Sequence, residues 1–586
     1  RYQELAKSKD ESSIRLGLDQ NSLEILEEYL EHGKAVAEER QRAQAANEAP
    51  HFQPLIEKWG GVTVAYRRPM QDSPAYTRNH EEITKALEEG IFYADYLSPL
   101  EAKLDQYGQV QSLICQRTAL NDDGKLVETD EQVVLPARAI LVATGARPNV
   151  AYHFEHRGTF EVENMQYRPH VFHNGALKSV PKASHCKDPS FGAFTSYTKD
   201  NRHVTFIGDT HPDFNGNVVK AVASGMRIYP KILETFGDRI HVRADTKEYD
   251  LFRRHIQDIL QPVVKSVTRH TPNIVEVCIR APQAAKRFHP GQIFRLQNFE
   301  TLSPVVQGTR LQTETLALTG SKVNSKTGDI SLIVRERGGS SRLCATLRPG
   351  DPVALMGPGG VRSKIHQNET VMIAGDWLAA IVLRALGPAL KQAGSKVLFI
   401  GYFPNKQEIF CRDDLEAASD ACVWITATGE PTETRRPQDA AATGDFVEII
   451  SRYAKGELHQ GEPVIPLEHV DALHITGTHC QIRKLRDARN GLLKQYFAKS
   501  PATTGSVYST MQCMLKGVCS QCLQWQVDPK TGKRTKAVFA CSWQDEPIDM
   551  VDLDALDDRL KQNHLQEHLT NLWLSYLFET NRVPKI

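Results

Sequence analysis

The sequence predicts a multidomain α/β protein in which a small β-barrel lies between two α/β domains and a cysteine-rich segment follows. The 586 residues exceed what one hydrophobic core can bury. Strands and helices alternate over residues 60–142 and again over 369–475, as in doubly wound sheets. Short β-branched strands between these regions, at 263–279 and 292–296, are typical of a small barrel.

Shifts in composition along the chain predict five segments. The first is rich in Glu, Ala, Lys and Arg, with leucines at helical spacing, and reads as a helical arm or insertion. In the next, Val133–Val142 is an apolar run that predicts a strand ending in Ala143-Thr144-Gly145. The predicted segments are the arm at 1–58, an α/β dinucleotide-type domain at 59–250, the barrel at 251–362, a second α/β nucleotide-type domain at 363–500, and a cysteine-rich loop with a helical tail at 501–586.

Charge and hydropathy exclude several classes of partner. Lys plus Arg and Asp plus Glu each number 71, so the bulk charge does not attract nucleic acid or an anionic membrane. No apolar run reaches the roughly 18–20 residues of a spanning helix. The start at Arg1 has neither Met nor a secretory leader, and we expect it to lie inside a longer polypeptide. Seven scattered cysteines suit a reducing, cytoplasmic compartment better than a disulfide framework.

The strongest local signal is a cluster of four cysteines. Cys513, Cys519 and Cys522 fall within ten residues, and Cys541 follows after eighteen more. Four thiolates meet the full ligand demand of a [2Fe-2S] cluster, and the spacing differs from the plant-type run by one extra residue in the first gap. Structural zinc is the main alternative, although zinc sites usually pair two C-x2-C doublets. Thiols without a ligand are the third reading.

Two turns in the predicted barrel have the composition of ligand contacts. Pro290-Gly291-Gln292 is a Pro-Gly turn that admits a close backbone approach to a planar ligand, or is an ordinary β-turn. Gly338-Gly339-Ser340-Ser341 resembles a loop feeding a helix N-terminus, where N–H groups and hydroxyls can hold a diphosphate. A simple N-cap is the alternative there.

Residues 253–541 resemble the electron-transfer subunit of dihydroorotate dehydrogenase and the small subunit of NADH-dependent ferredoxin:NADP oxidoreductase. In these ferredoxin-reductase-like families a flavin barrel, a nucleotide domain and a [2Fe-2S] loop follow in the order found here. The resemblance implies that Pro290–Gln292 packs beside the flavin ring, that Leu318 and Thr319 contact the flavin, and that Gly338, Gly339, Ser340 and Ser341 hold the FAD diphosphate. Thr315 stands where the families carry an arginine.

The second α/β domain departs from the dinucleotide-binding pattern. Its first strand ends in Ala374-Gly375-Asp376-Trp377, with a single glycine. An aspartate repels a pyrophosphate and an indole fills its space. We therefore expect this domain to bind nicotinamide nucleotide in an altered way or to serve as scaffold.

Residues 60–230 resemble a second family, the small subunit of glutamate synthase. Arg67 and Arg68 match the strand end that faces the 2′-phosphate of NADPH, a task that guanidinium performs well, with a solvated strand end as the alternative. Gly145 matches the crossing toward the FAD domain, and Gly208, Asp209 and Asn217 match the closing FAD motif. We find no G-x-G-x-x-G fingerprint, so the parts that enclose this FAD are expected upstream.

Together, the motifs and the two resemblances imply an NAD(P)H-dependent FAD oxidoreductase that passes electrons from a nicotinamide cofactor through FAD to a [2Fe-2S] cluster and an unidentified acceptor. Flavin is needed because it converts hydride chemistry into one-electron steps. The order of the two modules resembles fused bacterial FAD-dependent oxidoreductases. We nominate no residue as a catalytic acid or base. The alternatives are an electron-bifurcating transhydrogenase and an electron-transfer or docking subunit without its own turnover. Expected partners are the nicotinamide cofactor, an upstream part of a longer polypeptide or a partner subunit, and a redox protein, but not nucleic acid.

Overall fold

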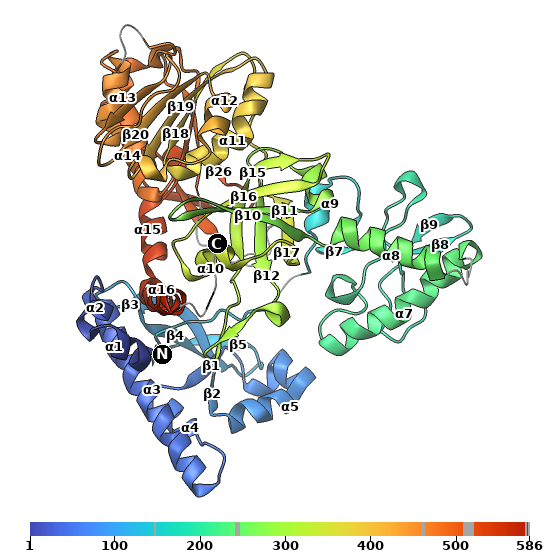
Figure 1. Ribbon diagram of the computed structural model, residues 1–586. Helices are drawn as coiled ribbons and strands as arrows, with labels where there is room; N and C mark the ends of the chain where they lie inside the picture. The colour runs from blue at the N-terminus through green and yellow to red at the C-terminus, as the bar shows by residue number, and fades with distance from the viewer. Residues whose placement is uncertain (146–147, 241–245, 459–462, 508–520, 581–582, 584–586) are drawn as a thin grey trace. The chain divides into compact units, whose positions relative to one another are not determined.

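The computed structural model describes residues 1–145, 148–240, 246–458, 463–507, 521–580 and 583 (Figure 1). The chain divides into two compact units. One comprises residues 17–243, and the other comprises residues 1–16 together with 244–586. Both helices and sheets are present in each, so the mixed α/β character predicted from the sequence is confirmed.

The 17–243 unit contains small sheets. β1 and β2 pair in parallel, with α5 as the crossover, and β3, β4 and β5 form an antiparallel meander. The elements are α3 (Gln20–Ala46), α4 (Gln53–Lys58), β1 (Val62–Tyr66), α5 (Pro74–Glu88), β2 (Ile91–Asp95), β3 (Leu97–Leu104), β4 (Val110–Leu120), β5 (Leu126–Pro136), α6 (Ala151–Glu155), β6 (Val162–Glu163), β7 (Gln166–Tyr167), β8 (His170–His173), β9 (Ala176–Ser179) and α7 (Val218–Phe236).

One predicted strand of this unit is wrong. β5 ends at Pro136, so the predicted strand 133–142 does not continue to Ala143. The reason is pairing: β5 lies antiparallel to β4 up to the Ser112–Pro136 pair, and the chain then leaves the meander. Leu141 and Val142 are consequently 89% and 81% exposed.

The barrel occupies the start of the larger unit. Six antiparallel strands lie in the order β10-β11-β16-β15-β12-β17, where the sequence predicts short β-branched strands. Alternate residues such as Val275, Val277 and Ile279 are buried in its core, as the two-residue period of a strand requires. The elements are α8 (Thr246–Leu260), β10 (Val263–Thr271), β11 (Ile274–Arg280), α9 (Pro282–Arg287), β12 (Ile293–Asn298), β13 (Val305–Val306), β14 (Thr309–Arg310), β15 (Leu316–Asn324), β16 (Asp329–Arg335), α10 (Gly339–Leu343) and β17 (Val353–Gly359).

A seven-stranded sheet follows the barrel. Its order is β21-β20-β19-β18-β22-β23-β26, and only the edge strand β26 is antiparallel to its neighbour. Because β18 lies between β19 and β22, the strand order reverses at β18, the position where open α/β sheets bind ligands. The elements are β18 (Thr370–Gly375), α11 (Trp377–Gln392), β19 (Lys396–Phe403), α12 (Arg412–Ala418), β20 (Ala421–Thr426), β21 (Ala440–Thr443), α13 (Phe446–Ala454), β22 (Ala472–Thr476), α14 (His479–Asn490), β23 (Ala502–Ser506) and β26 (Asp545–Pro547).

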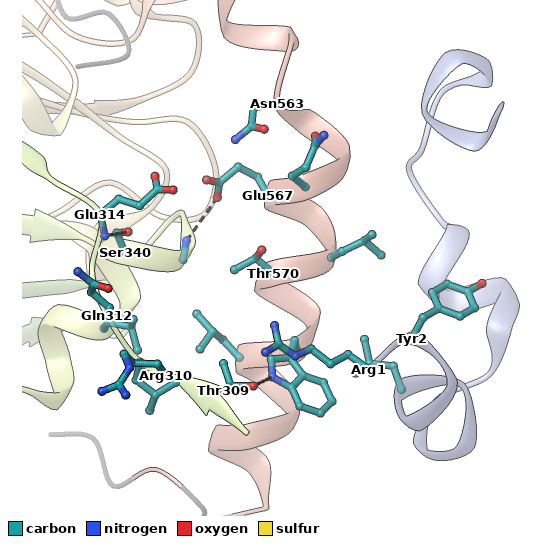
Figure 2. Close-up of a pocket in the computed structure, with 18 residues that line it drawn as sticks. Arg1, Tyr2, Thr309, Arg310, Gln312, Glu314, Ser340, Asn563, Glu567 and Thr570 are labelled. Carbon is teal, nitrogen blue, oxygen red and sulfur yellow. Dashed lines mark hydrogen bonds between the residues drawn. The ribbon is translucent and has the colours of Figure 1, made fainter. Parts of the chain in front are cut away.

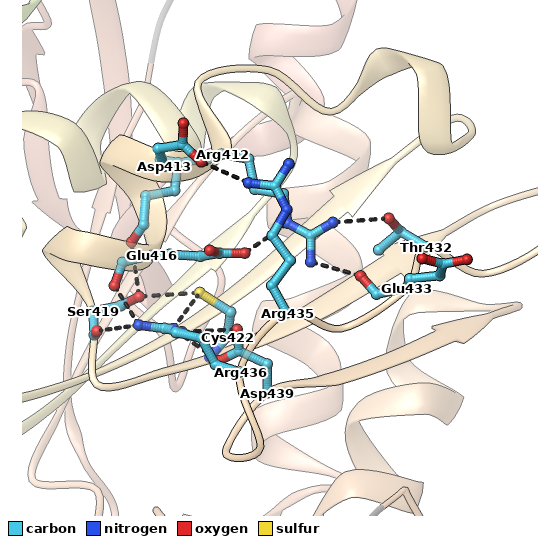
Figure 3. A network of polar contacts seen from close by, with 11 residues as sticks. Arg412, Asp413, Glu416, Ser419, Cys422, Thr432, Glu433, Arg435, Arg436 and Asp439 are labelled. Carbon is cyan, nitrogen blue, oxygen red and sulfur yellow. Dashed lines mark hydrogen bonds and ion pairs between the residues drawn. The ribbon is translucent and has the colours of Figure 1, made fainter.

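An arginine network fixes the segment between β20 and β21 (Figure 3). Arg436 donates to the carbonyl oxygens of Glu416 and Ser419 and pairs with Asp439 at 2.8 Å. Arg412 pairs with Glu416 at 2.6 Å. Arg436 is thus held near the amino ends of β20 and β21.

The C-terminal part contains a hairpin and two helices. The hairpin joins β24 (Leu523–Val527) to β25 (Arg534–Phe539), and α15 (Leu553–Lys561) and α16 (His564–Glu579) follow. α16 packs with α1 (Tyr2–Ser8) and α2 (Glu11–Arg15) around Leu5, Ile14, Trp573 and Leu577. Among the described residues, no helix combines the length and hydropathy needed to cross a membrane.

Candidate functional site

The hairpin β24–β25 brings two of the four predicted cluster ligands together. Cys522 precedes β24 and Cys541 follows β25, and both are fully buried. The backbone N–H of Cys541 donates to Sγ of Cys522 at 3.4 Å. Cys513 and Cys519 lie outside the described residues.

The cysteine pair packs against the barrel. Cys522 and Cys541 share a small apolar cluster with Ile293 at the start of β12, and Ala317 of β15 packs against it. Ile293 directly follows the Pro290–Gln292 turn, and Ala317 precedes Leu318. The donor set therefore fits an iron–sulfur cluster in its described half: two buried sulfurs, one with a backbone N–H aimed at it, beside an apolar wall.

The Pro290–Gln292 turn is tied to the segment that carries Cys541. Gly291 has φ of +90°, and a Cβ there would lie 2.1 Å from Oγ of Ser363, so only glycine fits. Nε2 of Gln544 donates to the carbonyl oxygen of Gly291 at 2.6 Å. Thr319 pairs with Ile293 across β12 and β15. The structure thus brings the predicted flavin strands and the cysteine pair into one region.

A buried carboxyl lies in the same C-terminal segment. Glu546 on β26 is fully buried, and Nε2 of Gln526 on β24 donates to its Oε2 at 2.9 Å. Burial raises the pKa of Glu546 to about 7. The sequence does not predict that Glu546 is buried, because a single Glu in a strand is ordinarily exposed to solvent.

The predicted diphosphate loop of the barrel faces a carboxylate of the C-terminal helix (Figure 2). The N–H of Gly339 donates to Oε2 of Glu567 at 3.3 Å. A Cβ at Gly338 would lie 2.9 Å from that same oxygen, and a Cβ at Gly339 would lie 2.8 Å from Cγ2 of Thr570. The two glycines therefore accommodate α16, and a flavin diphosphate fits this loop only when Glu567 is displaced. Sequence reasoning missed Glu567, which is 228 residues away along the chain.

The rest of this loop is engaged within the barrel. Ser341 accepts from the N–H of Gly338 at 2.9 Å, and Ser340 accepts from the N–H of Glu314 at 2.8 Å. The loop, α16 and α1 enclose a cavity of about 620 Å³ with both Glu314 and Glu567 in its wall. Arg1 and Arg310 line the same cavity, so its wall carries charges of both signs.

Arg295 was also missed by the sequence analysis. It lies on β12 opposite Ala317, and its guanidinium donates to Oγ1 of Thr315 at 2.9 Å. A guanidinium from the neighbouring strand thus reaches the position where the resembled families carry an arginine. An adjacent-strand partner cannot be recognised without the register of the sheet.

Asp376 closes the carboxyl edge of the seven-stranded sheet. Its Oδ1 accepts from the N–H of Leu378 at 3.0 Å, and its Oδ2 accepts from the N–H of Thr478 at 2.8 Å. The carboxylate thus bridges the N-termini of α11 and α14. Burial raises its pKa, and a Cβ at Gly477 would lie 3.1 Å from its Cγ. The residues at this turn do not fit a dinucleotide diphosphate, because the chain's own carboxylate takes the donors that a phosphate needs.

The site residues predicted in the 17–243 unit lie in turns and at a strand end. Arg67 and Arg68 are exposed after β1, and Gly145 has φ of +100°. Asp209 accepts from the N–H of Gly216 at 3.0 Å, and Asn217 caps α7 through the N–H of Lys220 at 2.8 Å. The N–H of Gly208 donates to Oγ of Ser224 at 2.8 Å.

Comparisons with known proteins found two curated relatives of note. No family model matches the chain. The chain is 25% identical over 582 residues to an uncharacterized protein of Rickettsia prowazekii, which covers 97% of this chain and 64% of the relative. It is 24% identical over 170 residues to the electron transfer subunit of dihydroorotate dehydrogenase B (NAD(+)) of Bacillus velezensis, covering 28% of this chain and 62% of that protein. The chain thus spans less than two thirds of either relative.

Solved structures similar to the chain include two ferredoxin-NADP oxidoreductases. The NADH-dependent reduced ferredoxin-NADP oxidoreductase structure matches with a TM-score of 0.43 and 18% identity, covering 54% of this chain and 98% of that one. A ferredoxin NADP+ reductase from Neisseria gonorrhoeae with bound FAD and NADP matches with a TM-score of 0.29 and 18% identity, covering 40% and 90%.

Proposed function

We propose that this chain is the electron-transfer part of an NAD(P)H-dependent flavin and iron–sulfur oxidoreductase. The observation that carries the proposal is the burial of Cys522 and Cys541 side by side against β12 and β15. The name of the Bacillus relative, an electron transfer subunit, agrees with this role. The final acceptor is left unassigned.

In this proposal Cys513, Cys519, Cys522 and Cys541 hold a [2Fe-2S] cluster, which supplies one-electron transfer when bound. The chain's own contribution is to position and shield the thiolates. The N–H of Cys541 is directed at Sγ of Cys522 and stabilises negative charge there. Ile293 and Ala540 keep water from the sulfurs. Direct contact between the cysteine pair and the barrel shortens the path that an electron would take between the predicted flavin strands and the sulfurs.

The flavin and the nicotinamide cofactor are proposed at different places. Pro290, Gly291, Gln292, Leu318 and Thr319 would line the flavin ring, with Gly338–Ser341 at its phosphate end. Arg67, Arg68, Gly145, Gly208, Asp209 and Asn217 would contribute to an NADPH and FAD site completed by another polypeptide segment. The bridge made by Asp376 supports entry of the hydride outside the 363–500 domain.

Anaerobic titration of the full chain tests the proposal. We expect dithionite to bleach the visible absorption of the cluster. We expect NADPH to bleach it when the chain is part of a longer polypeptide that completes the NADPH site. Cys480→Ser, at an exposed cysteine, is the matched control and should behave as the wild type. A colourless protein whose thiolates bind zinc would overturn the iron–sulfur assignment.

A second candidate is an electron-transfer or docking subunit without its own turnover. The closed turn at Asp376 and the contact of Glu567 with Gly339 favour it, since both take donors that cofactor phosphates use. Cluster absorption that responds to dithionite but to no pyridine nucleotide, even in the longer polypeptide, would select this candidate. The same bridge opposes a bifurcating transhydrogenase, which needs a second working nicotinamide site.

A further inference from the structure

A cluster of three chemically different ligands, none of them a predicted cluster cysteine, lies where the barrel meets the seven-stranded sheet. His270, Glu276 and Cys411 each offer one ligand atom, and these atoms all lie within 4.8 Å of one another. Nε2 of His270 lies 2.6 Å from Oε2 of Glu276 and 3.6 Å from Sγ of Cys411. Nitrogen, oxygen and sulfur donors thus face one another.

The local structure holds these side chains together. His270 lies at an irregularity in the pairing of β10 with β11, between Arg269 and Thr271, and bulges of this kind re-aim a side chain. Glu276 lies on the paired strand β11. Cys411 precedes α12 in the left-handed conformation, with φ of +48°.

The loop that carries Cys411 is anchored to the barrel hairpin. Glu408 accepts from Nδ2 of Asn273 at 3.0 Å and from Oγ1 of Thr271 at 3.5 Å. Two contacts therefore fix the distance between the hairpin and the loop. The ligand atoms are brought together by the fold and do not depend on a mobile surface chain.

The second oxygen of Glu276 is occupied. Oε1 accepts from the hydroxyl of Ser331 and lies 3.4 Å from the guanidinium of Arg384. Arg384 is itself balanced by Asp414 at 2.7 Å. Oε2 therefore remains directed at His270, as an oriented metal ligand requires.

We propose that His270, Glu276 and Cys411 form a zinc site with one open position. Zinc accepts this mixed set of imidazole, carboxylate and thiolate, and three protein ligands with a water in the fourth position are typical of accessible zinc sites. Tetrahedral zinc places its donor atoms about 3.2–3.8 Å apart. The sulfur–nitrogen separation of 3.6 Å meets this range, and the contact between His270 and Glu276 opens when the metal replaces the shared proton.

Charge and access agree with a divalent ion. One thiolate and one carboxylate neutralise Zn²⁺, while Asp414 is shared between Arg384 and Lys322. The side chains of His270 and Glu276 are 21% and 18% exposed, so water reaches the fourth position. A hydrogen-bonded thiol and imidazole without metal is the competing arrangement.

The test follows the thiol of Cys411 by alkylation and peptide mass spectrometry on the full chain. With Zn²⁺ alone as the probe, we expect labelling of Cys411 to slow at least tenfold, and a chelator to restore it. Mg²⁺ should give no protection, because it prefers oxygen donors. Cys480 is the matched control, since it is exposed and should label at the same rate throughout.

Two variants complete the test. His270→Asn and Glu276→Gln should each abolish the zinc-dependent protection while circular dichroism shows a folded chain. Equal labelling of wild-type Cys411 with and without zinc would overturn the proposal and leave the metal-free thiol–imidazole pair. Protection that persists unchanged in both folded variants would overturn it as well. Since the readout is confined to Cys411, neither result depends on iron at Cys522 and Cys541.

Discussion

The cysteine pair and the turn at Asp376 follow opposite chemistry within the same unit. Cys522 and Cys541 gather two soft sulfur donors in an apolar cluster. Asp376 instead places a carboxylate between two helix N-termini and satisfies their N–H groups from within the chain. The first arrangement suits a metal centre, and the second replaces an external anion.

In the proposed function, electron transfer through the cysteine pair does not need the nucleotide-type turn that Asp376 closes. A phosphate-binding turn is a set of backbone donors, and a single aspartate can take them over. Thiolates have no such internal substitute, because backbone groups do not replace them as ligands of iron.

Cys541→Ser should give the largest effect. Loss of one of four thiolates is expected to remove most bound iron and the associated visible absorption, since an oxygen donor holds the iron less well. Iron analysis after anaerobic purification measures it. Cys480→Ser is the control, and equal iron loss in both variants would contradict a specific role for Cys541.

Glu546→Gln should remove a pH dependence of the free energy of unfolding. The pKa of Glu546 is raised from 4.5 to about 7. Its contribution to folding stability is therefore fully present below about pH 4.5 and is lost as the pH rises through 7. The lost stability approaches about 3 kcal/mol above pH 7, since one pKa unit is worth about 1.4 kcal/mol. Urea unfolding at pH 5 and pH 8 should therefore show a steeper decline in wild type than in the variant. Parallel declines would contradict the burial of an ionisable carboxyl there.

Asp376→Ala should destabilise the chain by about 2–3 kcal/mol, because it removes a cap and leaves the N–H of Thr478 without its acceptor. Asp445→Ala is the matched control: Asp445 caps α13, beside the same sheet, through two N–H groups but is exposed, so about 1 kcal/mol is expected. Urea unfolding of both variants provides the comparison. Equal losses would mean that bridging α11 and α14 adds nothing beyond an ordinary cap.

Glu567→Gln should have the smallest effect on stability, below about 1 kcal/mol, because it retains an acceptor for Gly339. Removing the charge should tighten FAD binding about fivefold, since about 1 kcal/mol of repulsion between like charges is relieved. Flavin fluorescence quenching measures the affinity. Glu579→Gln, on the same helix and paired with Lys9, should leave it unchanged. Equal affinity in wild type and Glu567→Gln would place the diphosphate elsewhere.

Sequence patterns predicted the parts that follow local rules. The barrel strands and the parallel strands at 371–374, 397–400, 422–426 and 472–475 follow from apolar runs bounded by turns, and the sheet has them there. Asp376 was recognisable because it interrupts a glycine turn. Glu567 and Arg295 were not, since they act through contacts set by tertiary structure and sheet register. The strand expected at 133–142 failed because pairing, rather than apolar content, decides where β5 ends.

Iron and acid-labile sulfide counted per chain, with zinc measured in the same sample, distinguish a [2Fe-2S] cluster from a zinc site at the four cysteines. We expect about two irons and two sulfides per chain in anaerobically purified protein. Both should fall together in Cys522→Ser but not in Cys480→Ser. Zinc in place of iron, or no metal that depends on Cys522, would contradict the iron–sulfur assignment.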